Sequence, residues 1–293
     1  MVGDSGIRRA GWVVLFVGPG LVALLTFIVG PILASLVLTF YEWDLLTSPR
    51  FIGLDNFERL IHDDQFWSAL RHTITYIVGY IPLVMLLALG MALALNAKLP
   101  GLGALRTAFF LPVVSSWVAV ALLWSWLFNP RYGLVNYGLS KININGPAWL
   151  FDKDWAMPAI ILTSAWKDLG FVMVIFLAGL QAISPDYYEA AQLDGAGGFE
   201  RLRSITIPLL APTTFFVTVI SIIGSFQVFT QVYVMTEGGP AGATTVVVER
   251  IVTHAFSYGE MGYAATISWA LFLIIFAVTA AQLRLQRRRA FDA

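Results

Sequence analysis

The sequence contains no cysteine and few charged residues. The absence of cysteine from all 293 residues excludes disulfides, thiolate metal sites and cysteine nucleophiles. Only 12% of the residues are charged, against about a quarter in an ordinary soluble domain. The 18 basic residues are balanced by 18 acidic ones. No basic stripe is therefore available to follow nucleic-acid phosphates, and nucleic acid is excluded as a partner.

Long apolar runs fill most of the chain, which is 58% hydrophobic with a mean hydropathy of +0.76. If about 20 apolar residues make one bilayer crossing, the sequence predicts six spans. They cover residues 12–40, 69–97, 104–128, 157–182, 208–235 and 262–285. The first run is longer than the core of a signal peptide, which has about 7 to 15 residues, so we expect it to remain as a spanning helix. The predicted fold class is an all-α, polytopic membrane protein.

Positive charge orients the predicted spans. With the amino terminus in the cytoplasm, six crossings return the carboxyl terminus there, and ten lysines and arginines face inward against seven outward, as the positive-inside rule prefers. We therefore expect a multi-pass protein with both termini cytoplasmic. Outside the membrane, residues 56–67 place apolar side chains at near-helical spacing, which predicts an amphipathic helix at the interface.

A compact polar segment, EAAQLDGAGGFERLRSITIP at residues 189–208, interrupts the apolar runs between the fourth and fifth spans. Ser184 can cap a helix, Pro185 fits its first position and Gly195 is a natural terminator. These signals predict a short helix from Pro185 to Asp194, followed by a turn, at the cytoplasmic face. The residues alone leave two interpretations open, a well-capped connecting loop or a handle for a soluble partner.

Two charged residues, Lys167 and Asp168, lie near the middle of the fourth predicted span. A charge at the centre of a spanning helix costs about 2.5 to 3.5 kcal/mol on insertion scales, so such residues face a cavity or pair with each other. Both alternatives stay open. Ser164, Trp166 and Phe171 lie nearby, and aromatic faces beside hydrogen-bonding groups suit the apolar face and hydroxyls of a sugar.

The fifth span carries a second candidate wall for a solute path. Ser221 and Ser225 fall at helical spacing, and Gly224 leaves room beside them. Gln227 and Gln231, four residues apart, are predicted to share another face of the same helix. Polar residues in spans also stabilise helix packing by about 0.6 to 2 kcal/mol each. Ser221 and Ser225 could therefore serve helix packing instead of lining a solute path.

Other polar and aromatic residues receive structural interpretations. We expect packing or interface anchors at Trp117, Trp124 and Trp126. The three histidines are His62, His72 and His254. We expect them to be loop or interface residues and not metal ligands. No HExxH or GxSxG motif is present, so no catalytic or metal-binding residue is predicted.

The segment EAAQLDGAGGFERLRSITIPLLAP resembles the coupling motif of the permease subunits of ABC importers. The matching positions are Glu189, Ala190, Ala191, Asp194, Gly195, Ala196, Phe199, Ile205 and Pro208. The resemblance extends over almost the whole chain, through the segments 56–73, 106–130, 166–183 and 236–244. It points to the carbohydrate type of binding-protein-dependent inner-membrane component, related to the permeases of maltose and glycerol-phosphate importers.

This resemblance implies a type I ABC importer permease fold with a cytoplasmic coupling helix. It implies a first helix with an external segment at residues 1–66, a permease core at 67–286 and a cytoplasmic tail at 287–293. The residues expected to contact an ATPase are Glu189, Ala190, Ala191, Asp194, Gly195, Ala196 and Phe199. The expected location is a bacterial or archaeal cytoplasmic (inner) membrane.

The resemblance also implies a set of partners. These are a second permease subunit in a heterodimer, two copies of an ABC ATPase and an extracytoplasmic solute-binding protein. The chain itself lacks GxxxxGK[ST], and its GAGG has neither the lysine nor the hydroxyl residue that hold phosphates and magnesium. We therefore expect no cofactor and no enzymatic activity in this chain, with ATP and magnesium bound by the partner ATPase.

The expected solute is a sugar or sugar-like molecule, and the resemblance places residues 164–171 along the transmembrane sugar site of maltose-type permeases. Glycerol phosphate or another polyol phosphate is the alternative, because Lys167 could favour an anion. An ion-coupled secondary transporter is a remote alternative. It would need broken helices and ion-coordinating groups near the midplane, and it would have no use for the helix around Glu189. The sequence names neither the particular solute nor the partner permease.

Overall fold

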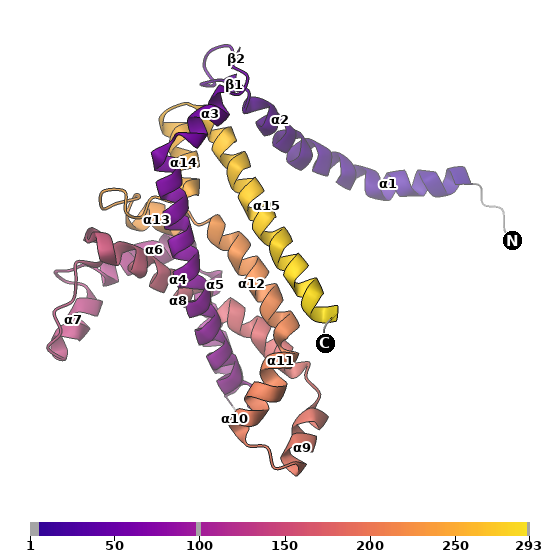
Figure 1. The fold of residues 1–293 in the computed structure, drawn as a ribbon, viewed down its shortest axis with the longest axis vertical. Helices are drawn as coiled ribbons and strands as arrows, with labels where there is room; N and C mark the ends of the chain where they lie inside the picture. The colour runs from indigo at the N-terminus through magenta and orange to yellow at the C-terminus, as the bar shows by residue number, and fades with distance from the viewer. Residues whose placement is uncertain (1–5, 98–100, 292–293) are drawn as a thin grey trace. The chain divides into compact units, whose positions relative to one another are not determined.

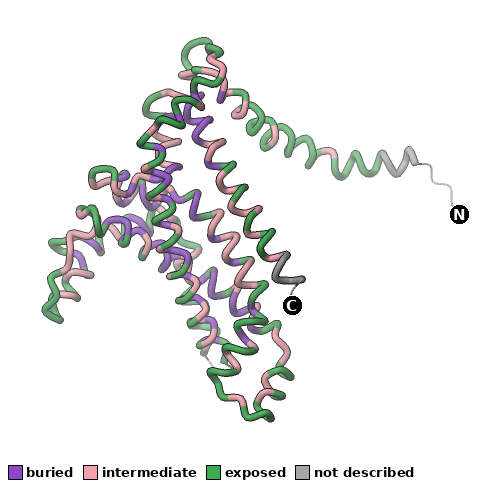
Figure 2. The backbone as a smooth tube through the Cα atoms, viewed as in Figure 1, coloured by how far each residue is buried: buried purple, intermediate pink, exposed green. Residues whose placement is uncertain are grey.

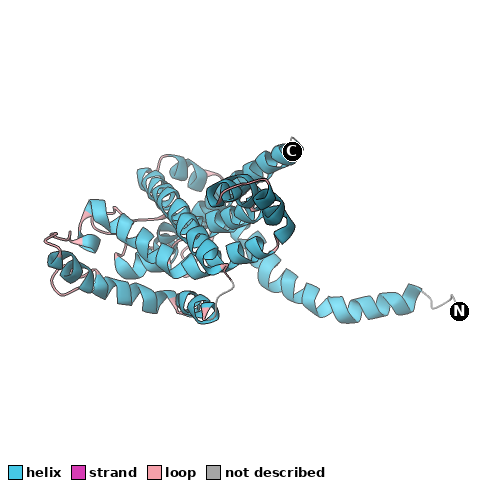
Figure 3. Cartoon of the chain, turned by 90° about the horizontal axis from the view of Figure 1, so that it is seen from below, coloured by secondary structure: helices cyan, strands magenta, loops and turns pink. Residues whose placement is uncertain are grey.

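The computed structural model describes residues 6–97 and 101–291, with side chains described at 11–97 and 101–286. Within these ranges nearly all regular structure is helical (Figure 1, Figure 3), as the all-α prediction requires. The chain divides into two compact units, residues 1–63 with 251–270 and residues 64–250 with 271–293. The domain limits predicted at residues 66 and 286 remain predictions. Residues 292–293 of the predicted tail, and the side chains of 287–291, lie outside the described part.

The first unit begins with a long apolar rod. It consists of α1 (Gly6–Leu24), a π-helical turn η1 (Leu25–Val29) and α2 (Gly30–Leu38). The π turn ends two residues before Pro31, whose missing N–H interrupts the α-helical hydrogen bonds of this turn. No residue in the most apolar window of Gly11–Leu38 is buried, and Figure 2 shows most of the described residues of this rod, from Gly11 onward, as exposed. Its apolar surface is therefore available to lipid or to another subunit.

The rest of the first unit folds around a small antiparallel pair of strands, β1 (Tyr41–Glu42) and β2 (Arg50–Phe51). It also contains α3 (Asp55–Ile61), the π turn η4 (Thr253–Ser257) and the start of α15 (Met261–Phe291). The side-chain amide of Asn56 on α3 donates to the carbonyl oxygens of Thr39, at 2.9 Å, and Tyr41, at 3.1 Å. These bonds fix α3 against the end of α2.

The predicted amphipathic helix over residues 56–67 is wrong in extent. α3 ends at Ile61, and the N–H of His62, its C-cap, bonds back to the carbonyl oxygens of Glu58 and Arg59. A new helix begins at Asp64, where a carboxylate in the first turn favours a helix start. Trp67 therefore belongs to the following long helix.

The second unit contains most of the helices. In chain order they are α4 (Asp64–Leu95), α5 (Leu102–Val114), α6 (Trp117–Leu127), α7 (Leu134–Lys141), the 3₁₀ turn η2 (Trp149–Phe151), α8 (Lys153–Gln181), α9 (Pro185–Leu193), α10 (Gly198–Arg201), the π turn η3 (Leu202–Thr206), α11 (Ile207–Leu209), α12 (Ala211–Phe226), α13 (Thr230–Met235) and α14 (Val247–Val252), whose last residues reach into the first unit.

The core of this unit lies where α4 packs against α8. Ala88 and Ala92 on α4 are fully buried, and small residues let helix backbones approach closely in membranes. The backbones of α5 and α8 also approach closely. A Cβ atom built on Gly170 would lie 2.1 Å from the carbonyl oxygen of Phe109. Glycine is therefore required where these two helices meet.

Four helical segments among the described residues are long and apolar enough to cross a membrane, and up to six if each of two bent pairs counts as one span. The four are Gly11–Leu38, Asp64–Leu95, Lys153–Gln181 and Met261–Gln286. The six-span prediction is thus matched in number only when the bent pairs are counted as spans.

The third and fifth predicted spans are wrong as single helices. The third is broken between α5 and α6, which meet at 99°. The fifth is bent by 61° between Leu209 and Ala211, next to Pro212, whose missing N–H weakens helix continuity. It is interrupted again between Phe226 and Thr230.

Candidate functional site

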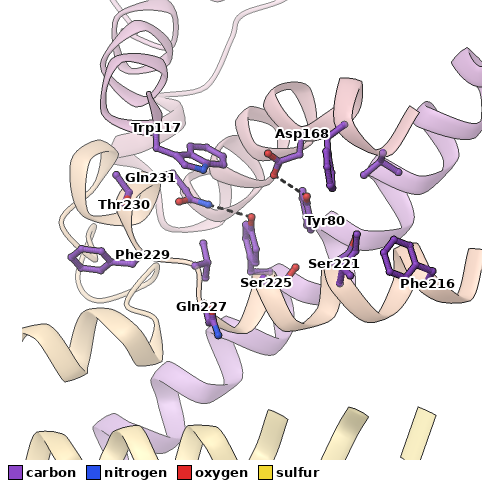
Figure 4. Close-up of a pocket in the computed structure, with 16 residues that line it drawn as sticks. Tyr80, Trp117, Asp168, Phe216, Ser221, Ser225, Gln227, Phe229, Thr230 and Gln231 are labelled. Atoms are coloured by element: carbon purple, nitrogen blue, oxygen red, sulfur yellow. Dashed lines mark hydrogen bonds between the residues drawn. The ribbon is translucent and has the colours of Figure 1, made fainter. Parts of the chain in front are cut away.

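The second unit contains an open cavity of about 540 Å³ where α12 is followed by α13. Its walls come from α4, α6, α8, α12, the start of α13 and the non-helical residues 227–229 (Figure 4). The lining residues are Tyr76, Tyr80, Trp117, Asp168, Phe171, Val172, Phe216, Ile220, Ser221, Gly224, Ser225, Gln227, Val228, Phe229, Thr230 and Gln231. The cavity therefore combines hydroxyl, amide and carboxylate groups with aromatic rings.

A hydrogen-bonded network holds one wall of the cavity in place. The hydroxyl of Tyr80 donates to Oδ2 of Asp168 at 2.9 Å (Figure 4). The ring of Tyr76 stacks on that of Tyr80, with centroids 5.3 Å apart. Nε2 of Gln231 lies 3.4 Å from both the Tyr76 hydroxyl and Oγ of Ser164. The acid on α8 is thus oriented by a residue of α4, and the amide of α13 is linked to both helices.

The opposite wall offers a hydroxyl that no protein group satisfies. Ser225 is only 3% exposed, and its Oγ has no hydrogen-bond partner among the described residues. Ser221 lies one helical turn earlier, and Gly224 adds no side chain between them. An unpaired buried hydroxyl costs about 1 to 3 kcal/mol. Because Oγ of Ser225 is itself buried, a solute could satisfy it only if the side chain turned toward the cavity.

Aromatic residues complete the lining, and one of them departs from our prediction. Trp117, interpreted from sequence as an anchor, instead lines the cavity, because α6 begins at this residue after the break from α5. Tyr76 and Tyr80, which also line the cavity, were not predicted from the sequence. Their hydroxyls, four residues apart within an apolar span, were a signal that could have identified them.

Lys167 does not line the cavity and does not pair with Asp168. It is 4% exposed, and its Nζ donates to the carbonyl oxygen of Val113 at 3.1 Å. The same atom lies 4.7 Å from the centroid of the Trp117 ring, within the range of a cation–π contact. The sequence left open whether the two charged residues face a cavity or pair with each other. Asp168 faces the cavity. Lys167 instead contacts the end of α5 and the start of α6.

The predicted solute-path residues therefore fall into two groups. Five line the cavity: Asp168, Phe171, Ser221, Gly224 and Ser225. Three do not: Ser164, Trp166 and Lys167. Ser164 lies behind the wall, bonded to Gln231, and Trp166 is 40% exposed with its ring against Trp124. Gln227 and Gln231 both reach the cavity, but the predicted shared helix face is wrong because the helix is interrupted between them.

The polar segment after α8 folds as its sequence signals predict. α9 begins at Pro185, and Oγ of Ser184 accepts a hydrogen bond from the N–H of Asp186. The helix ends at Leu193 with Asp194 as its C-cap, within one residue of the predicted end. Gly195 has a φ of +82°, the left-handed conformation that favours glycine after a helix.

We define residues 185–201, which contain α9 and α10, as the coupling segment. It lies at one end of the second unit, beyond the end of α8 (Figure 1). Glu189, Ala190 and Asp194 are exposed. Two large apolar side chains are also exposed, Leu193 by 90% and Phe199 by 76%. Exposed apolar groups beside charged ones are typical of a protein interface.

A helical bundle with broken helices, an open cavity lined by polar and aromatic side chains and an exposed polar segment is typical of a membrane transport subunit. The family of binding-protein-dependent transport system inner membrane components matches residues 74–291. The chain belongs to this family, the permease subunits of ABC importers, and is a multi-pass membrane protein.

Named relatives and a solved structure agree with this assignment. The lactose transport system permease protein LacF of Rhizobium radiobacter is 38% identical, covering 95% of this chain and 94% of the relative. The sn-glycerol-3-phosphate transport system permease protein UgpA of Agrobacterium fabrum is 34% identical, covering 94% of each chain. A bacterial ABC transporter involved in the import of the acidic polysaccharide alginate is 26% identical, with a TM-score of 0.82 over 96% of this chain and 97% of that one.

Proposed function

We propose that this permease conducts a sugar or sugar-like solute through the cavity between α4, α8 and α12. The observation that carries the proposal is a cavity whose walls pair hydroxyl and amide groups with aromatic rings inside a membrane transport subunit. Such walls match a sugar, whose rim of hydroxyls forms hydrogen bonds and whose ring faces pack on aromatic side chains. The relatives named for lactose and for alginate support a carbohydrate as the solute.

The transport cycle proposed for this chain depends on partner subunits. The coupling segment binds one of two ABC ATPase subunits, which hold the ATP and magnesium. A second, different permease forms a heterodimer with this chain, and an extracytoplasmic binding protein delivers the solute. Support for the last partner comes from the solved alginate transporter, which was crystallised in complex with its periplasmic protein. In this arrangement both termini and the coupling segment lie in the cytoplasm.

The fold supplies a route from the coupling segment to the cavity. α9 is followed without a long linker by α10, η3 and α11, which lead into α12. α12 carries Ser221, Gly224 and Ser225 of the cavity wall. Movement of the coupling segment by the closing ATPase would therefore reach the solute path through one continuous stretch of chain. ATP binding then shifts the balance between an outward-open and an inward-open conformation.

ATP-driven uptake into proteoliposomes tests this proposal. The transporter is purified with its partner subunits, and uptake of labelled lactose, maltose and trehalose is measured with its binding protein present. Ser225→Ala removes a hydroxyl from the cavity and is expected to lower solute affinity by the value of one hydrogen bond, about 0.5 to 1.5 kcal/mol. The control is Ser125→Ala, which removes a hydroxyl bonded to Ala121 on α6, outside the lining. Uptake that is equally affected by both changes would contradict the proposed path.

A further inference from the structure

The cavity carries a single formal charge among its described lining residues, the carboxylate of Asp168. The Tyr80 hydroxyl donates one hydrogen bond to it. A carboxylate has room for about four such bonds, so Asp168 can accept further donors from a solute. Nearby, Ser225 offers an unsatisfied hydroxyl, and Gln227 and Thr230 add neutral polar groups.

The neighbouring Lys167 neither lines the cavity nor pairs directly with Asp168, and its positive charge acts on that carboxylate only through space, from behind the wall. Successive residues of a helix diverge by about 100° around its axis, so Lys167 and Asp168 point in different directions from α8. Lys167 is bound to the carbonyl oxygen of Val113 and lies against the ring of Trp117. Trp117 itself lines the cavity. The cation is therefore held behind this wall by two contacts of its own.

We propose that Asp168 is a specificity-determining residue that makes this cavity accept uncharged polyhydroxylated solutes and reject phosphorylated or carboxylated ones. The inference rests on the proposed sugar path. A fixed carboxylate in a site of low dielectric repels a second anion strongly, whereas a neutral sugar hydroxyl can donate to it. Family membership does not decide whether the solute of this chain is neutral or anionic, because the relatives are named for solutes of both kinds.

Direct binding to the complete transporter tests this inference without selection by the binding protein. The wild-type complex is purified through a tag on this chain and placed in lipid nanodiscs. Binding is measured by saturation-transfer NMR and calorimetry, with trehalose and lactose as neutral probes and with trehalose 6-phosphate and glycerol 3-phosphate as anionic probes. We expect trehalose to bind at least about tenfold more tightly than trehalose 6-phosphate. In Asp168→Asn this preference should shrink to within about threefold.

Two control variants separate charge from structure. Tyr80→Phe removes the hydrogen bond to Asp168 but keeps the carboxylate, and Asp186→Asn removes an acid from the exposed coupling segment. Both should keep the preference for the neutral probe. If Asp168→Asn does not assemble with its partners, Gln227→Lys provides a second test, because Gln227 is exposed and lines the cavity. This added cation should strengthen binding of trehalose 6-phosphate at least about tenfold.

The outcomes distinguish this inference from the proposed function. Equal binding of neutral and anionic probes by the wild type would overturn the inference and leave the sugar path intact. An unchanged preference for the neutral probe in Asp168→Asn would also overturn the inference and leave the sugar path intact. No gain of anion binding in Gln227→Lys would have the same two consequences. If the wild type binds only the anionic probes, the proposed sugar function fails, and the inference fails with it.

Discussion

The hydroxyl oxygen of Tyr188 lies 3.0 Å from Oγ1 of Thr206. This contact joins α9 to the π turn η3, at the beginning of the stretch that leads into α12. Thr206 is 4% exposed, so the bond is shielded from water. It ties the coupling segment to the helix that carries part of the cavity wall.

Tyr188→Phe should loosen this joint without removing the aromatic ring. The loss of one hydrogen bond is expected to weaken the local structure by about 0.5 to 1.5 kcal/mol and to lower the amount of solute transported for each ATP hydrolysed. Hydrogen exchange of residues 185–206 and paired assays of uptake and ATP hydrolysis measure the two effects. Tyr187→Phe is the matched control, because this neighbouring ring is 57% exposed. An unchanged ratio of uptake to hydrolysis in Tyr188→Phe would exclude the joint from the transmission route.

Gly195→Val should disturb the turn after α9. The φ of +82° is strained for a β-branched residue, and such conformations cost about 1 to 3 kcal/mol. No atom lies within 4 Å of a Cβ built at Gly195, so the effect would come from the backbone and not from crowding within the chain. We expect ATP hydrolysis to continue while uptake falls.

Gly197→Val is the control for this turn. Gly197 has a φ of −70° and a ψ of +169°, which any residue adopts, and its Cβ position is also open. Uptake should stay near the wild-type level in this variant. A loss of uptake in both variants would show that bulk in the coupling segment, and not the conformation of Gly195, is what the ATPase interface rejects.

Gly224→Leu should fill part of the cavity. No atom lies within 4 Å of a Cβ at Gly224, and its position in α12 is helical. Leucine favours a helix over glycine by about 0.5 to 1 kcal/mol, so the fold should persist while solute affinity falls at least about tenfold. Binding titrations and the unfolding temperature measure these outcomes. Gly90→Leu on α4, equally open but outside the lining, should bind solute normally. Normal affinity in Gly224→Leu would show that solute passes elsewhere.

The first unit should lose stability in acid through Glu260. Its carboxylate accepts hydrogen bonds from Arg59, at 3.1 and 2.9 Å, and lies 2.7 Å from Nδ1 of His254. Partial burial raises the pKa of Glu260, but the bonds and charges of Arg59 and His254 outweigh it, so the pKa lies below the ordinary value of 4.5. Because the folded-state pKa is the lower one, this stabilisation is present above pH 4.5 and is lost as the pH falls through the folded-state pKa.

Glu260→Gln tests this pH dependence. The variant should unfold at a lower temperature than the wild type at neutral pH, and the difference should shrink as the pH is lowered below 4.5. Thermal unfolding followed across this range measures it. Glu42→Gln is a suitable control, because the Glu42–Arg50 pair is 63% and 74% exposed in its side chains and such pairs contribute little. A constant difference at all pH values would exclude the charge of Glu260 as the cause.

The parts of the structure that could be predicted are those whose signals lie close together in sequence. Ser184, Pro185 and Gly195 predict both ends of α9, because caps act within a single helical turn. The break at residues 115–116 has weaker local signals, Pro112 and Ser116 at the N-cap position of α6, and the break at 227–229 has no capping or proline signal of this kind. Both fall within apolar runs that satisfy the length of a spanning helix.

The cavity depends on contacts between distant residues, and this explains why it was predicted only in part. Asp168 and Ser225 were identified because polar groups are unusual in a span. The direction of Lys167 could not be predicted, since its partner Val113 lies 54 residues away on another helix. Tyr80 likewise meets Asp168 across 88 residues of chain.

The interrupted stretch at residues 227–229 has a consequence for how strongly a solute can be retained. Hydrocarbon offers no partner to main-chain amides and carbonyls, so an unwound stretch at membrane depth is tolerated only beside protein or a hydrated space. A solute that enters this cavity gives up its hydrogen bonds to water, and the walls give up theirs. New hydrogen bonds between solute and protein replace them, and each replacement contributes little net binding free energy. We therefore expect the solute to be bound loosely enough to leave the cavity again, as repeated transport requires.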